Sequence, residues 1–307
     1  MTSTASLTNA LSADPFGPEA LEDPNEFHTA MRDAGPVVYL DRYDLYAMGR
    51  YEQVRAALVD WQGFQSGAGV GLVNYRQDPR PPRGPLETDP PRHDALRVVL
   101  EAILNVRSLR RLRTQWFADA ERLVDEALRQ PEFDAVTELT ETFPLRVFPD
   151  AVGIPDAGRE NLLPLEDHLF NSFGPPNDLA AKGAEHAAER AAWISAQCAR
   201  EALTDHGFGA QVWAAADRGD ISTAQAPEGV RAMLSAGVDT PCTGWAPCST
   251  PSPPTPNSGR RCDASRAWLE WPSTKRSVGS HRCRRSSAPR PATSRSGTLA
   301  SRTARRS

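Results

Sequence analysis

Long hydrophobic runs are absent from this sequence of 307 residues. No stretch approaches the ~20 consecutive apolar residues that a membrane-spanning helix requires, and the mean hydropathy is −0.50. The N-terminal residues contain no basic run followed by an apolar run, so we expect no secretory signal. We therefore expect a cytoplasmic protein without a membrane span and without a framework of disulfides.

Several signatures of nucleotide, hydrolase and metal sites are also missing. The sequence contains neither G-x-x-x-x-G-K-[ST] nor G-x-S-x-G. The glycines of residues 67–71 follow no convincing strand, which argues against a dinucleotide-binding loop. The five cysteines never occur with C-x-x-C spacing, so the sequence predicts no metal-ligating residues.

Acidic residues are scarce at the end of the chain. Residues 241–307 hold 13 Lys and Arg but only Asp263 and Glu270, a net charge of +11, whereas residues 1–240 hold 22 Lys and Arg and 37 Asp and Glu, a net charge of −15. Residues 241–307 also have few large aliphatic side chains, too few to offset the entropy lost on ordering. The sequence predicts a folded domain over residues 1–240 and a disordered tail over residues 241–307.

Hydrophobic periodicity predicts a mainly α-helical domain with a small β part near residues 36–50. Residues 44–64 begin with a strand-like alternation and continue as a helix with Val54, Leu58 and Trp61 on one face. A helix begins near Pro90 and Pro91, since proline is favoured in a first turn. Another spans residues 108–130, with Ser108 as its N-cap. Further helices are expected around 135–150, 161–172, 180–204 and 227–240.

His93 and Arg97 form the first chemically suggestive cluster. In a helix that begins at Pro90, residues four apart lie on the same face. A guanidinium and an imidazole N–H on one face suit an anionic ligand. On spacing alone, a solvated helix face explains the same pair.

Gly237, Asp239 and Thr240 form the second cluster. Gly237 weakens the expected helix and allows close approach of another group. A threonine hydroxyl can hydrogen-bond to the carbonyl of the preceding turn, and an acid beside an alcohol could relay protons. The alternative is a helix that simply ends at Pro241.

Taken together and in order, these segments resemble a bacterial soluble cytochrome P450, and the resemblance covers about residues 13–240. The propionate-binding helix and the oxygen-binding helix of that family are matched by TDPPRHDALR (88–97) and SAGVDT (235–240). The early strand-helix unit and the middle helices are matched by LYAMGRYEQVRAALVDWQGFQSG (45–67), FPLRVFPDAVGIP (143–155) and FNSFGPPNDL (170–179). The ordered set is far more specific than any one of its members.

The resemblance implies roles by position. His93 and Arg97 would hold the haem propionates, and Ala236 and Gly237 would lie against the haem, with Gly237 allowing the bend where dioxygen sits. Asp239 and Thr240 would deliver protons for O–O cleavage. The implied activity is a monooxygenase that hydroxylates or oxidatively demethylates a small organic molecule. A cysteine thiolate would ligate the iron, and a ferredoxin-type protein would supply electrons.

The resemblance also suggests a substrate class. Two of the matched segments are similar to the subgroup that oxidises para-substituted aromatic acids, in which an Arg-Pro-Pro element meets the substrate carboxylate. Arg80 stands in that place, 13 residues before His93, and Ser235 would be a second polar contact. The alternative for Arg80 is an exposed loop arginine.

The tail departs from the family pattern. Neither Glu-x-x-Arg nor Phe-x-x-Gly-x-x-x-Cys-x-Gly occurs in residues 241–307. Reading the degenerate codons of the tail from each third base permits TVHGLGALLHALATHPEQW directly after SAGVDT, and a Glu-x-x-Arg further on. We interpret the tail as out of frame after Thr240, and we expect a truncated, inactive chain without a competent haem site.

Two alternatives from other classes stay open. The basic tail could serve as a nucleic-acid-binding arm, although the frame interpretation explains the same arginines without a function. The remainder could be a helical interaction module without chemistry, which would unfold cooperatively without haem. We expect instead a partly molten domain, because haem and the missing third would supply much of its core.

Overall fold

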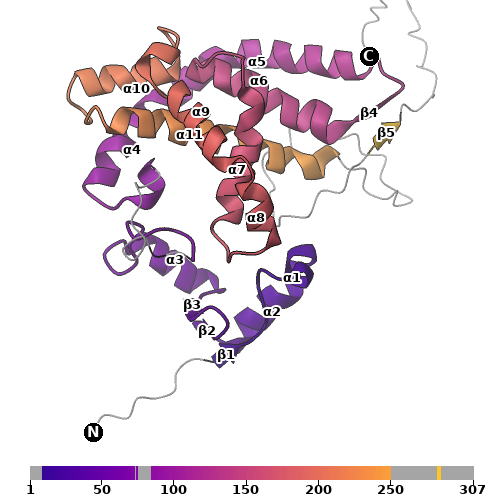
Figure 1. The fold of residues 1–307 in the computed structure, drawn as a ribbon, viewed down its shortest axis with the longest axis vertical. Coiled ribbons are helices and arrows are strands. Elements are labelled where there is room, and N and C mark those ends of the chain that lie inside the picture. The colour runs from indigo at the N-terminus through magenta and orange to yellow at the C-terminus, as the bar shows by residue number, and fades with distance from the viewer. Residues whose placement is uncertain (1–8, 73, 75–83, 250–281, 285–307) are drawn as a thin grey trace, which may run out of the picture.

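The computed structural model describes residues 9–72, 74, 84–249 and 282–284. Helices dominate the described part, and the strands are short, which confirms the expected mainly α class with a small β part. Figure 1 shows the N-terminal elements at one end of the molecule and the longer helices gathered at the other. None of the helices in these residues combines the length and the apolar character needed to cross a membrane.

The N-terminal elements build a small three-stranded sheet. Its strands have the order β1-β2-β3, with β2 parallel to β1 and antiparallel to β3. The β part predicted near residues 36–50 is confirmed by β2 and β3. The elements of this part are β1 (Asn9–Leu11), α1 (Pro18–Glu22), α2 (Pro24–Ala34), β2 (Val38–Leu40), β3 (Leu45–Ala47) and α3 (Tyr51–Val59).

The helix predicted after the strands is present as α3, but its apolar face points to solvent. Val54 is 37% exposed and Leu58 is 80% exposed. Trp61, which we expected on the same helical face, follows the end of α3 and is 42% exposed. The periodicity therefore predicted the helix correctly, but no described element covers these side chains.

The helix predicted near Pro90 is α4 (Arg92–Ile103), preceded by a short 3-10 helix, η1 (Gly84–Glu87). All four apolar side chains of its stripe, Leu96, Val99, Leu100 and Ile103, are buried. The next helix, α5 (Val106–Ala127), begins earlier than expected. Its N-cap is Asn105, whose side chain accepts from the backbone N–H groups of Arg107 and Ser108, so the assignment of Ser108 as the cap is wrong.

The middle of the chain contains more breaks than the sequence suggested. The alanine-rich stretch predicted as one helix over residues 180–204 divides into three pieces, and His186 between the first two has a φ of 58°. A helix over residues 208–217 was not predicted. The elements are β4 (Glu132–Asp134), η2 (Val136–Glu141, a π-helix), α6 (Thr142–Val152), η3 (Arg159–Asn161), α7 (Leu162–Asn171), α8 (Asp178–Ala184), α9 (Ala187–Gln197), η4 (Arg200–Ala202) and α10 (Phe208–Asp217).

The longest helix, α11 (Gln225–Ser249), is central to the core. Val230, Leu234, Val238 and Cys242 repeat every four residues along it, and all four are buried. This stripe packs against α6, α7 and α10 in one apolar cluster. Because packing on both sides of Pro241 holds the helix, the loss of one backbone donor at proline does not end it.

Helix α11 continues past residue 240, where we expected a disordered tail to begin. Residues 241–249 are helical, and β5 (Arg282–Arg284) pairs antiparallel with β4, so the prediction of disorder is wrong for these two segments. Residues 250–281 and 285–307 lie outside the described residues. The domain boundary that we predicted at residue 240 falls inside α11.

Candidate functional site

The predicted donor pair lies on one side of α4, as its spacing required. The imidazole of His93 is 34% exposed, and its Nδ1 lies 2.9 Å from Oδ1 of Asp94. The guanidinium of Arg97 is 59% exposed, and its Nε donates to Oε1 of Glu101 at 2.7 Å. Both donors already bind carboxylates one or four residues away, at a surface where such pairs contribute little stability. An incoming carboxylate could therefore replace these partners at small cost.

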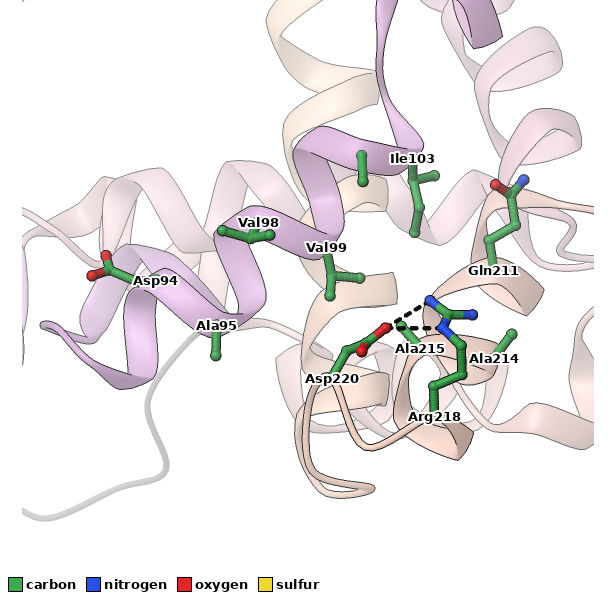
Figure 2. A pocket seen from close by; sticks show the side chains of 11 residues that line it. Asp94, Ala95, Val98, Val99, Ile103, Gln211, Ala214, Ala215, Arg218 and Asp220 are labelled. Carbon is green, nitrogen blue, oxygen red and sulfur yellow. Dashed lines mark hydrogen bonds and ion pairs between the residues drawn. The ribbon is translucent and has the colours of Figure 1, made fainter.

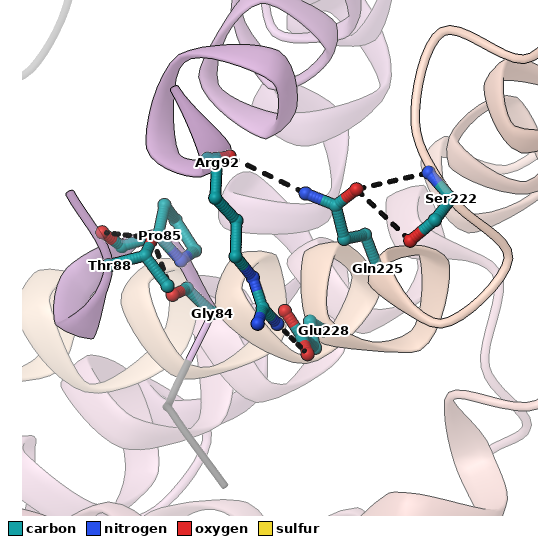
Figure 3. A network of polar contacts seen from close by, with 7 residues as sticks. All are labelled: Gly84, Pro85, Thr88, Arg92, Ser222, Gln225 and Glu228. Carbon is teal, nitrogen blue, oxygen red and sulfur yellow. Dashed lines mark hydrogen bonds and ion pairs between the residues drawn. The ribbon is translucent and has the colours of Figure 1, made fainter. Parts of the chain in front are cut away.

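A polar clasp fixes the start of α4 against the start of α11, as Figure 3 shows. Arg92 Nη2 donates to Oε1 of Glu228 at 2.6 Å, and the side-chain amide of Gln225 donates to the carbonyl of Arg92 at 3.4 Å. Gly84 has a φ of +57°, and a Cβ there would lie 3.3 Å from the carbonyl oxygen of Glu228. The clasp holds His93 and Arg97 in a fixed position relative to α11.

The second predicted cluster exposes one face of α11. Ala236 and Thr240 are both exposed, and the hydroxyl of Thr240 donates to the carbonyl oxygen of Ala236 at 2.6 Å. This back-bond to the preceding turn is the contact that the sequence suggested for a threonine in a helix. Ser235 and Asp239 are partly buried beside this face. An open helix face with a hydroxyl and a carboxyl could contact a flat ligand and handle protons.

Gly237 has a packing role that the sequence did not reveal. A Cβ built at Gly237 would overlap the ring of Phe148 on α6. The absence of a side chain therefore lets the two helices approach closely, which is one of the uses of glycine. Phe148 lies within the 143–155 segment already singled out, but nothing in its spacing indicated the contact.

The two cysteines with described side chains are both buried. Burial raises the pKa of the Cys198 thiol to about 12, and burial together with the charges of Asp239 and Glu141 raises that of Cys242 to about 12. Burial likewise raises the pKa of the Glu141 carboxyl, and the charge of Asp134 adds to the effect. Because a metal is ligated by the thiolate, neither thiol is prepared to bind one. Cys242 also lies about 200° around the helix axis from Thr240.

Of the two predicted substrate contacts, the structure describes Ser235. Arg80 lies outside the described residues, and Ser235 is partly buried on α11. The structure brings Ser235, Ala236, Gly237, Asp239 and Thr240 onto two consecutive turns of one helix. His93 and Arg97 stand on the neighbouring α4.

A hollow of about 710 Å³ lies between α4 and α10, and Asp94, the partner of His93, is among its lining residues. Figure 2 shows Asp94 and Val98 of α4 along this hollow and the ion pair of Arg218 with Asp220 near it. Around the helix axis, Val98 lies about 140° from His93. We therefore do not include the hollow in the site.

Comparison with known proteins finds sequences that are similar to this chain. No protein-family model matches the chain. The chain is 44% identical over 239 residues to cytochrome P450 CYP199A2 of Rhodopseudomonas palustris, a match covering 77% of this chain and 58% of that protein. It is 26% identical over 160 residues to the putative cytochrome P450 123 of Mycobacterium tuberculosis, covering 52% of this chain and 40% of the relative.

Solved structures show the same fold. The crystal structure of CYP109E1 from Bacillus megaterium in complex with testosterone matches with a TM-score of 0.63 at 17% identity, over 74% of this chain and 60% of that one. Cytochrome P450 CYP109Q5 from Chondromyces apiculatus matches with a TM-score of 0.54 at 23% identity, over 75% and 58%. At such identities the likeness concerns the fold.

These matches extend over only part of the known proteins. The chain spans 58% of the length of the Rhodopseudomonas relative. The matched part of this chain is similar in sequence to a bacterial cytochrome P450 and similar in fold to solved cytochrome P450 structures.

Proposed function

We propose that the site formed by α4 and α11 belongs to a haem-dependent monooxygenase that acts on a small organic molecule. The observation that carries this proposal is the open face of α11, where Ala236 and Thr240 stand exposed above a buried stripe. The 44% identity to a curated cytochrome P450 supports it. Haem, when bound, supplies the activation of dioxygen that such a reaction needs.

The chemistry of the donors fits the edge of a haem. Arg97 and His93 carry N–H donors toward solvent on one side of α4, and charge-assisted hydrogen bonds to propionates are stronger than neutral ones. In our proposal these two residues hold the propionates, and Ala236 and Gly237 lie against the ring. Asp94 and Glu101 then lose their present partners to the ligand.

Thr240 and Asp239 are the proposed proton-handling residues. The Oγ1 hydrogen of Thr240 is directed to the carbonyl of Ala236, which leaves the lone pairs of Oγ1 free to accept a hydrogen bond from a group on the open face. Asp239 is the next residue back and is partly buried. A carboxyl and a hydroxyl in adjacent positions can pass a proton from solvent to that face.

The described residues do not fit the iron of a haem. Cys198 and Cys242 are the cysteines with described side chains, and both stay protonated at neutral pH. We propose that a polypeptide of this sequence forms no thiolate-ligated haem and is inactive on its own. The absence of the family's cysteine loop from residues 241–307 supports this.

A spectrum tests the two parts of the proposal separately. The full chain is purified with added haem, and its reduced carbon-monoxide difference spectrum is recorded. We expect haem binding that weakens when Arg97 is replaced by Ala, without the band of a thiolate-ligated haem. A thiolate band would overturn the inactivity, and haem binding unaffected by the Arg97 and His93 substitutions would overturn the assignment of the propionate partners.

The substrate and the electron donor are finer proposals. We propose a para-substituted aromatic acid as substrate, held by Arg80 and Ser235, and a ferredoxin-type protein as the electron donor. The two sequence segments similar to the aromatic-acid subgroup support the first. Calorimetric titration with a para-substituted benzoate tests it: an Arg80→Ala variant should bind more weakly, whereas equal binding to both chains would exclude Arg80.

A further inference from the structure

The hollow between α4 and α10 has the size and the lining of a small-molecule site. Its volume of about 710 Å³ falls within the range of about 300–1,000 Å³ that is common for such sites. Val99, Ile103 and Ala215 line the hollow and are themselves buried. Val98 also lines it and is 65% exposed. Two helices therefore offer an apolar surface to the apolar part of a ligand (Figure 2).

The charged side chains at the hollow differ in their partners. Nε and Nη2 of Arg218 both contact Oδ2 of Asp220, at 3.0 and 2.8 Å, so these two charges offset each other. The side chain of Asp94 is 63% exposed, and its Oδ1 lies 2.9 Å from Nδ1 of His93. No arginine or lysine among the described residues pairs with this carboxylate. The charge that the hollow offers to a ligand is therefore the negative charge of Asp94.

Asp94 stands at the boundary between the hollow and the face that carries the donor pair. Around the axis of α4, Asp94 lies about 60° from Arg97 on one side and about 40° from Val98 on the other. Its carboxylate contacts His93, and the residue also lines the hollow. The same carboxylate can therefore pair either with His93 or with a cation in the hollow.

We propose that the hollow binds a small amine, with one ammonium group and an apolar body the size of a phenylalkyl group, and that the ammonium takes the Asp94 carboxylate from His93. The apolar body would cover Val98 and Val99, and the ammonium would form a charge-assisted hydrogen bond with Asp94. An anion is not favoured here, because Asp220 already occupies the guanidinium of Arg218.

Binding of the amine changes what His93 can contact. Once Asp94 has turned to the ammonium, Nδ1 of His93 has lost its carboxylate partner, and the imidazole can donate to another acceptor. This second step rests on the proposed function, in which His93 and Arg97 hold the propionates of haem. The amine and a porphyrin that carries propionates should then strengthen each other's binding by the same factor.

Ligand-detected NMR titrations of the full chain without haem test the amine site. The probes are phenethylamine and phenethyl alcohol, which have the same apolar body and differ in the charged group. Asp94→Asn removes the carboxylate charge from the hollow. Asp125→Asn makes the same change in net charge at an exposed position of α5. Ala102→Trp fills the hollow from α4, because Ala102 is one of its lining residues.

Asp94→Asn should weaken binding of the amine by about twofold to fivefold, the range expected for a largely exposed ion pair, and should leave binding of the alcohol unchanged. Asp125→Asn should change neither, and Ala102→Trp should prevent saturable binding of both. Equal weakening of the amine by the two Asn variants, or equal loss of amine and alcohol with Asp94→Asn, would overturn the ion pair. Unchanged amine binding in Ala102→Trp would overturn the hollow as the site.

Metal-free protoporphyrin tests the release of His93, since it has the propionates of haem but no iron that an amine could ligate. Its affinity is measured by fluorescence with and without saturating phenethylamine. The amine should strengthen porphyrin binding to the parent chain by about twofold to fivefold and should have no effect on the Asp94→Asn and His93→Ala variants.

The outcomes separate this coupling from the proposed function. Porphyrin binding to the parent chain that the amine leaves unchanged or weakens would overturn the release of His93. A parent chain that binds the amine through Asp94 but binds no porphyrin would overturn the propionate partners and the coupling, whereas the amine site would stand.

Discussion

The helical body around α11 and the N-terminal part up to residue 64 use similar amphipathic sequences with opposite results. In the body, Leu96, Leu162, Ile194 and Leu234 are almost completely buried. Within residues 9–64, all of which the structure describes, Val38 and Leu40 are the buried hydrophobic side chains. The same part exposes Tyr51 by 74%, Leu58 by 80% and Val59 by 70%.

The two regions differ in the elements that pack against their apolar helix faces, and not in the hydrophobic patterns of those helices. The buried stripe of α11 meets the apolar sides of α6, α7 and α10, which surround this helix. The face of α3 meets no such stripe in the described residues. Amphipathicity therefore specifies which side of a helix is available for packing, and the rest of the fold decides whether that side is covered. Stability measurements on substitutions in the two regions test whether α11 is covered and the α3 face is open in solution.

The largest effect is expected from Leu234→Ala in α11. Leu234 is fully buried in the central cluster, and truncation of a buried leucine costs about 2–5 kcal/mol through lost transfer free energy and the cavity left behind. Urea unfolding followed by circular dichroism measures the loss. A change below about 1 kcal/mol would mean that the body is loosely packed, as we expected for a partly molten domain.

A smaller loss is expected from Gly237→Ala, because the new Cβ would overlap the Phe148 ring. Overpacking of this kind costs about 1–3 kcal/mol, partly offset by the ~1 kcal/mol that alanine gains over glycine in a helix. Adding Phe148→Ala should make the two losses less than additive, with a coupling of about 0.5–3 kcal/mol. Strict additivity in this double-mutant cycle would argue against the contact.

Glu141→Gln tests the electrostatics where η2 meets α11. Burial and Asp134 raise the pKa of Glu141 above 4.5, so the folded state holds a proton on this group at pH values where the unfolded chain has lost it. Stability contributed by this group is therefore lost as the pH rises through that window. The Gln variant should be more stable than the parent at pH 7, and the difference should shrink near pH 4. A constant difference across this range would exclude titration of Glu141 as the cause.

The smallest effect is expected from Leu58→Ser in α3. With 80% of Leu58 exposed, the substitution removes little buried apolar area, and surface changes usually stay within about ±0.5 kcal/mol. Differential scanning calorimetry of the purified chain measures the shift. A loss as large as that of Leu234→Ala would show that the α3 face is covered in solution, and the contrast between the two regions would disappear.

Local patterns predicted the elements that local contacts determine. The buried stripe of α4 could be read from its spacing of three and four residues, and every member is buried. The break at His186 could not, since alanine-rich sequence favours a continuous helix by propensity alone. The helix over 208–217 was missed although its alanines favour a helix. Pro241 suggested a helix end, but burial of Val238 and Cys242 on either side outweighs one lost backbone donor.

For the candidate site as well, the sequence predicted the contacts between residues close together in the chain. The shared face of His93 and Arg97 and the back-bond of Thr240 involve residues four apart, so the sequence sufficed for both. The Phe148 ring against Gly237 and the ion pair of Arg92 with Glu228 join residues far apart in the chain. Contacts of this kind depend on how the helices pack against one another, so they cannot be inferred from the spacing of residues within one helix.

The clasp between Arg92 and Glu228 has a consequence for synthesis on the ribosome. The two residues are 136 positions apart, and at about 5–20 residues per second the second of them is added roughly 7–27 s after the first. During that interval the apolar stripe of α4 has been translated, but its partner α11 has not. Leu96 and Val99 of the nascent chain therefore wait several seconds or more for their packing partners on α11, and the two halves of the site can meet only after that interval.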